Sequence, residues 1–201
     1  MKGEELVGLF ANGPTSLVFY ATYTLWFFSE AIGAWLVPGL RRRGATRVRR
    51  DRGSGALIFL SIFVSVFVAF SFGYSGLAGL PDWTFYPGIF LILVGVLVRQ
   101  WAIAVLGRFF SLTVRVAEGH RVVDKGPYQL VRHPSYTGVL IMFIGLGLAV
   151  QSWGALLVLL ILFGLAYGYR IRVEERTLAS ELGQDYLSYA RRTKRLVPFL
   201  V

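Results

Sequence analysis

The sequence predicts an all-α integral membrane protein with about five transmembrane helices. Of its 201 residues, 55% are hydrophobic, and the mean hydropathy is +0.60. The apolar residues form long uncharged runs rather than amphipathic stripes, which is typical of membrane spans. Backbone groups in lipid must satisfy their own hydrogen bonds, so helices are expected. The length favours one domain over residues 1–201, with two N-terminal helices in 1–80 and a core in 81–201.

Five apolar runs mark the expected spans: Leu17–Pro38, Ala56–Leu80, Phe85–Val98 with an extension to Leu106, Tyr136–Val150 and Trp153–Tyr169. The last two are short against the roughly 20 residues of a spanning helix. Only Gln151 and Ser152 separate them, which predicts a tight helical hairpin. A further helix is expected over Glu174–Arg192, interrupted at Gly183 and lying on the membrane surface. The end of the chain, Leu196–Val201, is expected to fold back against the helices.

The net charge of +10 is concentrated in three segments: Arg41–Arg52, Arg108–Arg132 and the tail from Arg170. The loop Gly73–Tyr86 carries only Asp82. Five helices bring the basic segments to one side, and basic residues favour the cytoplasmic side. We therefore expect a multi-pass protein of a bacterial or archaeal cytoplasmic membrane, with its site facing the cytoplasm. Membrane lipids are the expected partners, and nucleic acid is not.

Several kinds of site are excluded or disfavoured by residue types. The chain has no cysteine, so disulfides and thiolate chemistry are excluded, and the presence of only two histidines disfavours a histidine-rich metal site. No glycine-rich dinucleotide fingerprint is present, so a Rossmann-type fold is not expected. Glu30 lies inside an apolar run, where a carboxylate is often functional. A position near the membrane interface is the alternative for Glu30.

The segment Gly126–Gly138 is the first candidate for chemistry. Gly126 and Pro127 signal a turn, and Pro134 fits the first turn of the helix that follows. Unpaired N–H groups at such a helix start attract a negatively charged group. Arg132 and His133 add donors, and nearby tyrosines add aromatic faces. We interpret the segment as one wall of a ligand pocket; contact with lipid headgroups is the simpler alternative.

Arg170 and Glu174 form the second candidate. They are four residues apart and share a helix face, and Tyr167 lies one turn earlier. An arginine there can bind a carboxylate through two hydrogen bonds. A glutamate can hold an ammonium group or position a nucleophile. An exposed ion pair, worth below about 1 kcal/mol, is the alternative. We expect the two residues to form the opposite wall of the same pocket.

These motifs resemble those of the isoprenylcysteine carboxyl methyltransferase family and of the related membrane phospholipid methyltransferases. The resemblance covers about the last hundred residues. The matching blocks are Gly126-Pro127-Tyr128, Val131–Gly138, Arg170 with Glu174-Glu175, Leu182-Gly183 with Tyr186 and Tyr189, and Leu196-Val197-Pro198. Two glutamates stand where membrane sterol reductases have an Arg-Asp pair, and those reductases have a later cysteine. This difference favours methyl transfer.

The resemblance implies S-adenosyl-L-methionine as methyl donor, bound without a Rossmann domain, and no metal. The residues it assigns to the cofactor are His120, Arg121, Val122, Val123, Tyr128, Arg132, His133, Pro134, Ser135, Tyr136 and Glu174. Arg170 and Glu174 would be catalytic, with Arg170 and Tyr167 at the methyl acceptor. Arg115 is expected to border the pocket. Residues 81–201 would then be the catalytic core.

The expected acceptor is lipophilic, a small molecule or a prenylated substrate, methylated on the carboxylate of an isoprenylcysteine-like group. A phospholipid N-methyltransferase and a thiol methyltransferase are alternatives within the superfamily. An NADPH-dependent membrane reductase of the sterol-reductase type is the alternative from another class, and a non-catalytic protein that keeps the fold is a third. The oligomeric state stays open.

Overall fold

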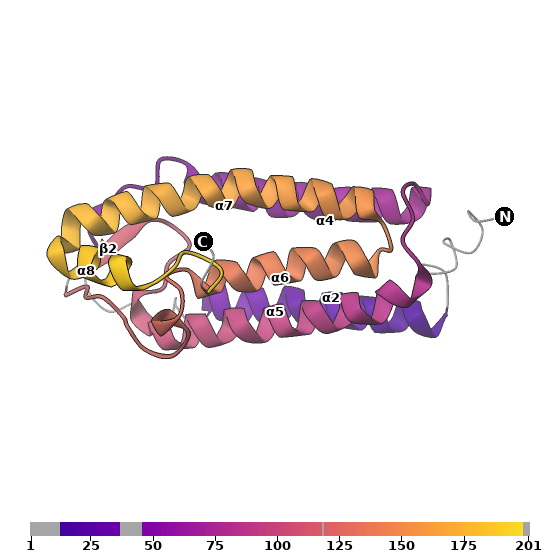
Figure 1. Cartoon of the computed structure of the whole chain (residues 1–201), viewed down its shortest axis with the longest axis horizontal. Coiled ribbons are helices and arrows are strands. Elements are labelled where there is room, and N and C mark those ends of the chain that lie inside the picture. The colour runs from indigo at the N-terminus through magenta and orange to yellow at the C-terminus, as the bar shows by residue number, and fades with distance from the viewer. Residues whose placement is uncertain (1–12, 37–45, 118, 199–201) are drawn as a thin grey trace.

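The computed structural model describes residues 13–36, 46–117 and 119–198. Five long helices run side by side along the long axis of this part of the chain (Figure 1). They are α2 (Pro14–Glu30), α4 (Ser54–Ser75), α5 (Phe85–Leu106), α6 (Pro134–Ala149) and α7 (Trp153–Leu182). The remaining elements are short: a π-helix (Ala31–Leu36), 3-10 turns at Asp82–Thr84, Gly107–Phe109 and Gly126–Gln129, strands β1 (Thr46–Arg49) and β2 (Arg115–Ala117), and α8 (Gln184–Arg192). The predicted helical architecture is confirmed, and the antiparallel β1–β2 pair was not predicted.

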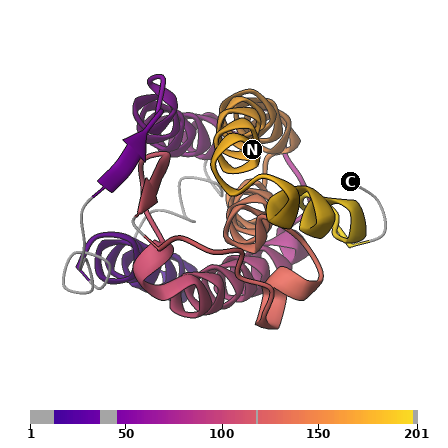
Figure 2. The ribbon, with the colours of Figure 1, turned by 90° about the vertical axis from the view of Figure 1, so that its left-hand side faces the viewer.

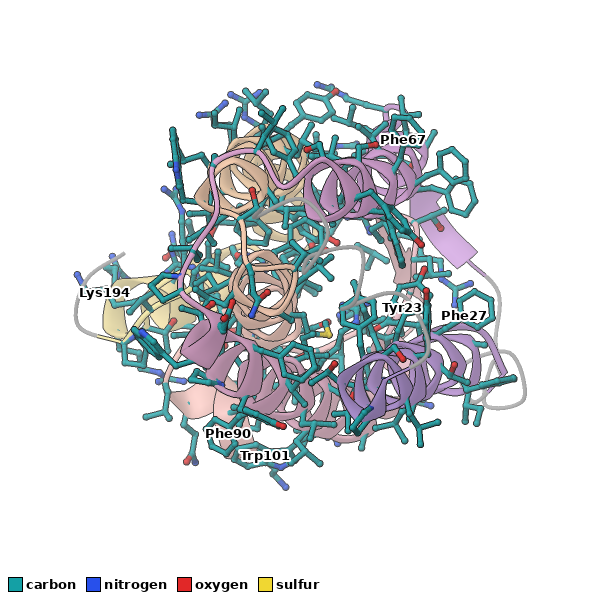
Figure 3. The ribbon with its side chains drawn as sticks, turned by 90° about the vertical axis from the view of Figure 1, so that its right-hand side faces the viewer. Tyr23, Phe27, Phe67, Phe90, Trp101 and Lys194 are labelled. Atoms are coloured by element: carbon teal, nitrogen blue, oxygen red, sulfur yellow. The ribbon has the colours of Figure 1, made fainter. Side chains whose placement is uncertain are left out.

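The outer surface of the bundle is apolar. Three helices are long and apolar enough to cross a membrane, namely Ser54–Ser75, Asp82–Phe109 and Trp153–Leu182, and Pro134–Ala149 is a shorter apolar helix. Figure 3 shows Phe27, Phe67, Phe90 and Trp101 on the outside of the bundle, where their exposed fractions are 54–69%. Large apolar side chains at this density on an outer surface are characteristic of contact with lipid. The chain is therefore an integral membrane protein.

The helix ends differ from the predicted runs in α4 and agree with them in α5. Helix α4 stops at Ser75 rather than at Leu80, because Gly76 and Ala78 take left-handed backbone conformations. Helix α5 ends at Leu106, which confirms the predicted extension past Arg99, whose charge is paired inside the bundle. The predicted end of the first run, Pro38, lies outside the described residues.

The last long helix corrects the prediction of two separate helices. A span ending at Tyr169 and a surface helix beginning at Glu174 were expected, but α7 is one continuous helix of 30 residues. The helix is interrupted at Gly183, whose φ of 56° is a left-handed conformation that favours glycine. Arg170 and Glu174 therefore lie in the middle of a rigid helix rather than at its end.

The hairpin between α6 and α7 is tight, as predicted, and it is joined to the loop before α5. Gln151 has a positive φ of 54°, and its carbonyl accepts the Leu80 N–H at 2.7 Å. The Ser152 hydroxyl donates to the Leu77 carbonyl at 3.0 Å. At the opposite end of the bundle lie β2, α8 and the segment between α5 and α6 (Figures 1 and 2). The described parts of the three basic segments thus share one end.

Helices α5 and α6 touch through their backbones. A Cβ atom on Gly145 would lie 2.7 Å from the carbonyl oxygen of Gly88, and one on Gly95 would lie 2.6 Å from that of Gly138. Small residues that allow such close approach are a common basis of helix association in membranes. This contact holds α6 against α5, and the candidate pocket lies at the start of α6.

We expect Gly145→Ala to destabilise the protein, because its methyl group would clash with the backbone of α5. Overpacking of this kind costs about 1–3 kcal/mol. Gly164→Ala is the matched control: a Cβ atom there meets nothing within 4 Å, and alanine improves a helix by roughly 0.5–1 kcal/mol. Unfolding in detergent measures both variants. Equal stability of the two would contradict the close contact.

Candidate active site

A cavity lies at the basic end of the bundle, with about 890 Å³ of empty space including the part open to solvent. Its walls come from the α5–α6 connector, the start of α6, the second half of α7 and α8. Ten predicted cofactor residues line it: His120, Arg121, Val122, Val123, Tyr128, Arg132, His133, Ser135, Tyr136 and Glu174. Arg115 lines it too, as do Tyr186 and Tyr189, which sequence analysis named among the family-like blocks but did not assign to the site.

Three predicted site residues do not line the cavity. Pro134 is buried in the first turn of α6, where it starts the helix. Arg170 and Tyr167 are 2% and 1% exposed and lie behind the cavity wall, in the interior of the bundle. The two predicted clusters are nevertheless brought together, because Tyr136 in the wall contacts both Arg170 and Tyr167.

The Arg-His-Pro segment is held by the C-terminal segment. The backbone N–H of Arg132 donates to the Lys194 carbonyl at 2.7 Å, and that of His133 donates to the Arg195 carbonyl at 3.0 Å. The Thr137 hydroxyl donates to the Leu196 carbonyl at 2.7 Å. The described part of the predicted C-terminal segment thus folds back against α6, and residues 199–201 lie outside the described residues.

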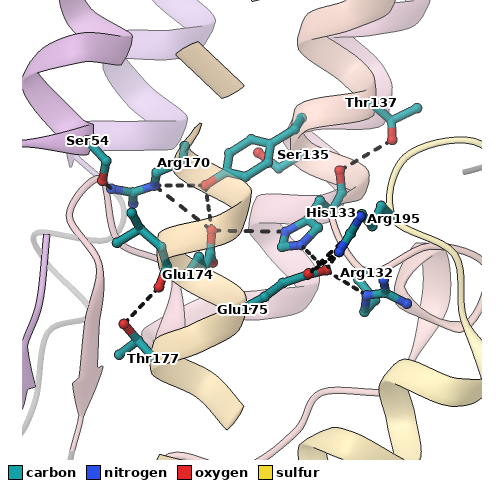
Figure 4. A network of polar contacts seen from close by, with 12 residues as sticks. Ser54, Arg132, His133, Ser135, Thr137, Arg170, Glu174, Glu175, Thr177 and Arg195 are labelled. Atoms are coloured by element: carbon teal, nitrogen blue, oxygen red, sulfur yellow. Dashed lines mark hydrogen bonds and ion pairs between the residues drawn. The ribbon is translucent and has the colours of Figure 1, made fainter. Parts of the chain in front are cut away.

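The Glu175 carboxylate binds several basic side chains, although sequence analysis gave this residue no role of its own. Its carboxylate accepts hydrogen bonds from Arg132 Nε at 2.9 Å and Arg195 Nη2 at 3.0 Å, and it lies 3.4 Å from His133 Nε2 (Figure 4). Arg132 also donates to the Ala190 carbonyl at 2.8 Å. The guanidinium of Arg132, expected at the cofactor, is therefore engaged in holding α6, α7 and α8 together.

A chain of hydrogen bonds joins Arg170 to Glu174 through the Tyr136 hydroxyl. Arg170 Nε donates to the Tyr136 oxygen at 3.1 Å, and that hydroxyl donates to Glu174 Oε2 at 2.7 Å. The direct Arg170–Glu174 separation is 3.9 Å. Figure 4 shows Glu174 between Arg170 and His133. The two residues share a helix face as their spacing predicts, but Arg170 is buried rather than part of an exposed pair.

Two partners of Arg170 come from the linker and helix start of the N-terminal half, and sequence analysis missed both. Arg170 Nη1 donates to Asp51 Oδ1 at 2.7 Å and to the Ser54 hydroxyl at 2.9 Å. Burial raises the pKa of the Asp51 carboxyl, but the N–H groups of Val114 and Gly55 and then Arg170 outweigh it and lower the pKa overall. The sequence signal that could have identified Asp51 is its position as the single acidic residue among the seven arginines of Arg41–Arg52.

Glu30, whose role the sequence left open, is paired inside the bundle. Arg99 donates from Nη2 to Glu30 Oε2 at 2.8 Å and from Nε to Oε1. The same guanidinium donates from Nη1 to the Ser135 hydroxyl at 2.7 Å. Since Ser135 lines the cavity, this ion pair ties α2 and α5 to the start of α6. Glu30 is therefore not a lone carboxylate, and its position relative to the membrane interface stays a prediction.

His120 lies against an aromatic ring in the cavity wall. Its ring stacks on Phe109 with centroids 4.6 Å apart. Burial lowers the pKa of His120, and the opposing effect of Glu174 is smaller. His120 Nδ1 and the hydroxyl of Tyr186 are buried and have no hydrogen-bond partner among the residues that the structure describes. The wall thus offers a neutral imidazole and two unpaired polar atoms.

We expect the neutral His120 to make stability depend on pH. Its pKa lies below the ordinary value of 6.5, so on acidification the unfolded chain takes up a proton before the folded one does, and stability is lost as the pH falls. Unfolding in detergent between about pH 7.5 and 5.5 should show a steeper loss for the native chain than for His120→Asn. Parallel curves would contradict a depressed pKa.

The geometry can be compared with known proteins. The sequence model of the isoprenylcysteine carboxyl methyltransferase family matches residues 88–180, which contain both predicted walls. Protein-S-isoprenylcysteine O-methyltransferase B of Arabidopsis thaliana is 29% identical over 74% of this chain and 82% of its own length. The cobalt-zinc-cadmium resistance protein CzcN of Cupriavidus metallidurans is 37% identical over 49% of this chain and 46% of its own length.

A solved structure shares the fold. It is that of the eukaryotic intramembrane Ras methyltransferase ICMT, with a TM-score of 0.61, 20% identity, and coverage of 99% of this chain and 68% of that chain. At this identity the likeness concerns the fold alone. It extends over the N-terminal helices, which residues 88–180 do not include. The family match and the curated relatives support a place for this chain in the isoprenylcysteine carboxyl methyltransferase superfamily, and the solved structure shows that the fold is shared.

Proposed function

We propose that the chain is a membrane methyltransferase that transfers a methyl group from S-adenosyl-L-methionine to the carboxylate of a lipophilic, isoprenylcysteine-like acceptor. One observation carries the proposal: Tyr136 connects buried Arg170 to Glu174 at the wall of a large cavity. The cavity lies at the basic end of the bundle, and Arg170 is buried in the apolar interior next to it. Support also comes from the Arabidopsis relative, whose name states O-methylation of protein S-isoprenylcysteine.

The cavity has the properties that this cofactor requires. His120 Nδ1 and the Tyr186 hydroxyl have no partners among the described residues and can meet polar groups of a ligand. Tyr128 and Tyr189 supply aromatic faces, and Glu174 supplies a negative charge. Carboxylates and aromatic faces both attract a sulfonium cation.

When bound, the cofactor supplies an electrophilic methyl group on a positively charged sulfur. The residues of this chain then have to position the two reactants in line, since proximity and orientation lower such barriers most. Glu174 would face the positive charge from the cavity wall. Arg170 would hold the acceptor carboxylate from inside the bundle, and Tyr136 separates the two. A carboxylate is already anionic and needs no general base.

The membrane arrangement is part of the proposal. We take α2, α4, α5, α6 and α7 as five crossings, with the basic end in the cytoplasm by the distribution of arginine and lysine. Helices α2 and α6 have 17 and 16 residues, and local thinning of the bilayer accommodates such lengths. A lipid-borne acceptor then reaches Arg170 from the bilayer, and the cofactor enters from the cytoplasm. The source membrane would be bacterial or archaeal.

One observation favours a second acceptor class. The Arg170 guanidinium is already paired with Asp51, so an acceptor without a carboxylate is compatible with the same site. A phospholipid amine or a lipophilic thiol would fit this alternative, with Glu174 or Asp51 as a nearby base. The name of CzcN specifies no methyl acceptor, so this relative does not decide between the classes.

We expect the purified protein in detergent to bind S-adenosylmethionine and its demethylated product, because the cavity wall offers complementary charge and unpaired polar atoms. Isothermal titration measures both ligands, with NADPH as the comparison. Binding of NADPH with no binding of either methyl-donor ligand would reject the methyltransferase in favour of a reductase.

Glu174→Ala and Arg170→Ala should each reduce turnover by on the order of 100-fold, since both act by positioning. Arg172→Ala is the matched control, because Arg172 lies on the same helix two residues after Arg170 and its side chain is exposed. Rates from a labelled-methyl assay and unfolding temperatures should be measured together. Full activity of both variants would remove Arg170 and Glu174 from the mechanism.

The acceptor can be identified by a labelled-methyl assay against membrane extracts followed by mass spectrometry. We expect a methyl ester on an S-prenylcysteine carboxylate, because Arg170 can bind a carboxylate through its planar guanidinium. N-blocked S-farnesylcysteine, phosphatidylethanolamine and an alkyl thiol are defined test acceptors. Label on the amine or the thiol alone would replace the carboxylate with the second acceptor class.

A further inference from the structure

We infer that Asp51 is a positioning residue of this site: it holds Arg170 from the side opposite Tyr136 and ties Arg170 to a wall of the cavity. The inference rests on the proposed function. Asp51 lies outside residues 88–180, to which the family match is confined. It belongs to the basic segment Arg41–Arg52, to which sequence analysis gave no part in the site.

The contacts of the Asp51 carboxylate are more numerous than those of a simple ion pair. Oδ1 accepts from Arg170 Nη1 at 2.7 Å, from the Val114 N–H at 3.0 Å and from the Ser54 hydroxyl at 3.2 Å. Oδ2 accepts from the Gly55 N–H at 3.2 Å. Because Ser54 also accepts from Arg170 Nη1 at 2.9 Å, Asp51, Ser54 and Arg170 form a closed triangle of hydrogen bonds.

This triangle determines how Arg170 presents its remaining N–H groups. With Nη1 held by Asp51 and Ser54, the planar guanidinium directs Nε to the Tyr136 oxygen. A tyrosine oxygen that accepts this bond has its own proton available for Glu174 Oε2, and the structure has that bond at 2.7 Å. Asp51 therefore sets the orientation of Arg170 directly, and that of Tyr136 and Glu174 through Arg170.

The Asp51 carboxylate also contacts a wall of the proposed cofactor cavity. Val114, whose N–H it accepts, lines the cavity together with Arg115 and Val116 of β2. Arg50 N–H also donates to the Val114 carbonyl at 3.0 Å, continuing the β1–β2 pairing. One carboxylate thus connects the residue proposed for the acceptor with a wall of the proposed cofactor cavity.

A purely structural role for Asp51, as the cap of α4, makes a different prediction. The Asp51 side chain accepts the Gly55 N–H and its carbonyl accepts the Ser54 N–H, as in a helix cap. Asparagine caps a helix about as well as aspartate. Asp51→Asn keeps the size of the side chain and one accepting oxygen, which can serve the Gly55 N–H or the Val114 N–H but not both, and it removes the charge that holds Arg170.

The test uses the full chain purified in detergent, with three variants compared with the native protein. Asp51→Asn should lower kcat for N-blocked S-farnesylcysteine by about 10- to 100-fold. The Kd for S-adenosylhomocysteine should stay within about twofold, because Val114 remains held by the Arg50 N–H. Asp124→Asn is the matched control. It removes the same charge from another arginine pair, Asp124–Arg192, whose residues make no contact with Arg170 within the part of the chain that the structure describes.

Ser54→Ala is the third variant and keeps the test decisive if Asp51→Asn does not fold. It removes one corner of the triangle and should lower kcat by a smaller factor, about three- to tenfold, again without a change in cofactor affinity. A native kcat in Asp51→Asn, or in Ser54→Ala when Asp51→Asn does not fold, overturns the inference. So does a parallel loss of kcat, cofactor affinity and unfolding temperature, which marks a structural role.

The failure of the proposed function has a separate signature. If the native protein binds neither S-adenosylmethionine nor S-adenosylhomocysteine, or transfers no methyl group to any offered acceptor, the proposed function fails and the inference fails with it. If the native protein binds and methylates while Asp51→Asn matches it in kcat, only the role of Asp51 is overturned.

Discussion

Burial of the Arg170 guanidinium is the constraint on which the rest of the site depends. Its side chain is 2% exposed inside an apolar bundle, where an unpaired charge is strongly destabilising. The described neighbours compensate it with a carboxylate, Asp51, and two hydroxyls, those of Ser54 and Tyr136. These three residues come from the N-terminal linker, α4 and α6. Compensating one charge therefore draws both halves of the chain together at the cavity.

The same physical solution occurs at Arg99. Its guanidinium is bound by Glu30 of α2 and by Ser135 of α6, and Ser135 precedes Tyr136. The start of α6 is thus held by two buried arginines from different helices, while the C-terminal segment holds the backbone of Arg132 and His133. A helix start fixed in three ways presents its side chains to a ligand with little freedom, which is what positioning catalysis requires.

Because α7 is one continuous helix, it connects the interior of the bundle with the wall of the cavity. Arg170, inside the bundle, and Glu174, in the cavity wall, lie one helical turn apart on the same rigid element. In the proposed reaction, a bilayer-borne acceptor and a water-soluble donor would meet across that single turn. The Tyr136 hydroxyl between them accepts from one residue and donates to the other, so the orientation of one side depends on the other.

The helices, the common end of the basic segments and the two motifs of the site could all be predicted from the sequence. These depend on local properties: the length of an apolar run, the position of Gly-Pro and His-Pro, and a spacing of four residues on a helix. The partners of the buried charges follow from the tertiary packing alone. Asp51 meets Arg170 across 119 positions, and Glu30 meets Arg99 across 69. A lone acid in a basic linker has many possible partners, and only the packing of the whole bundle selects one.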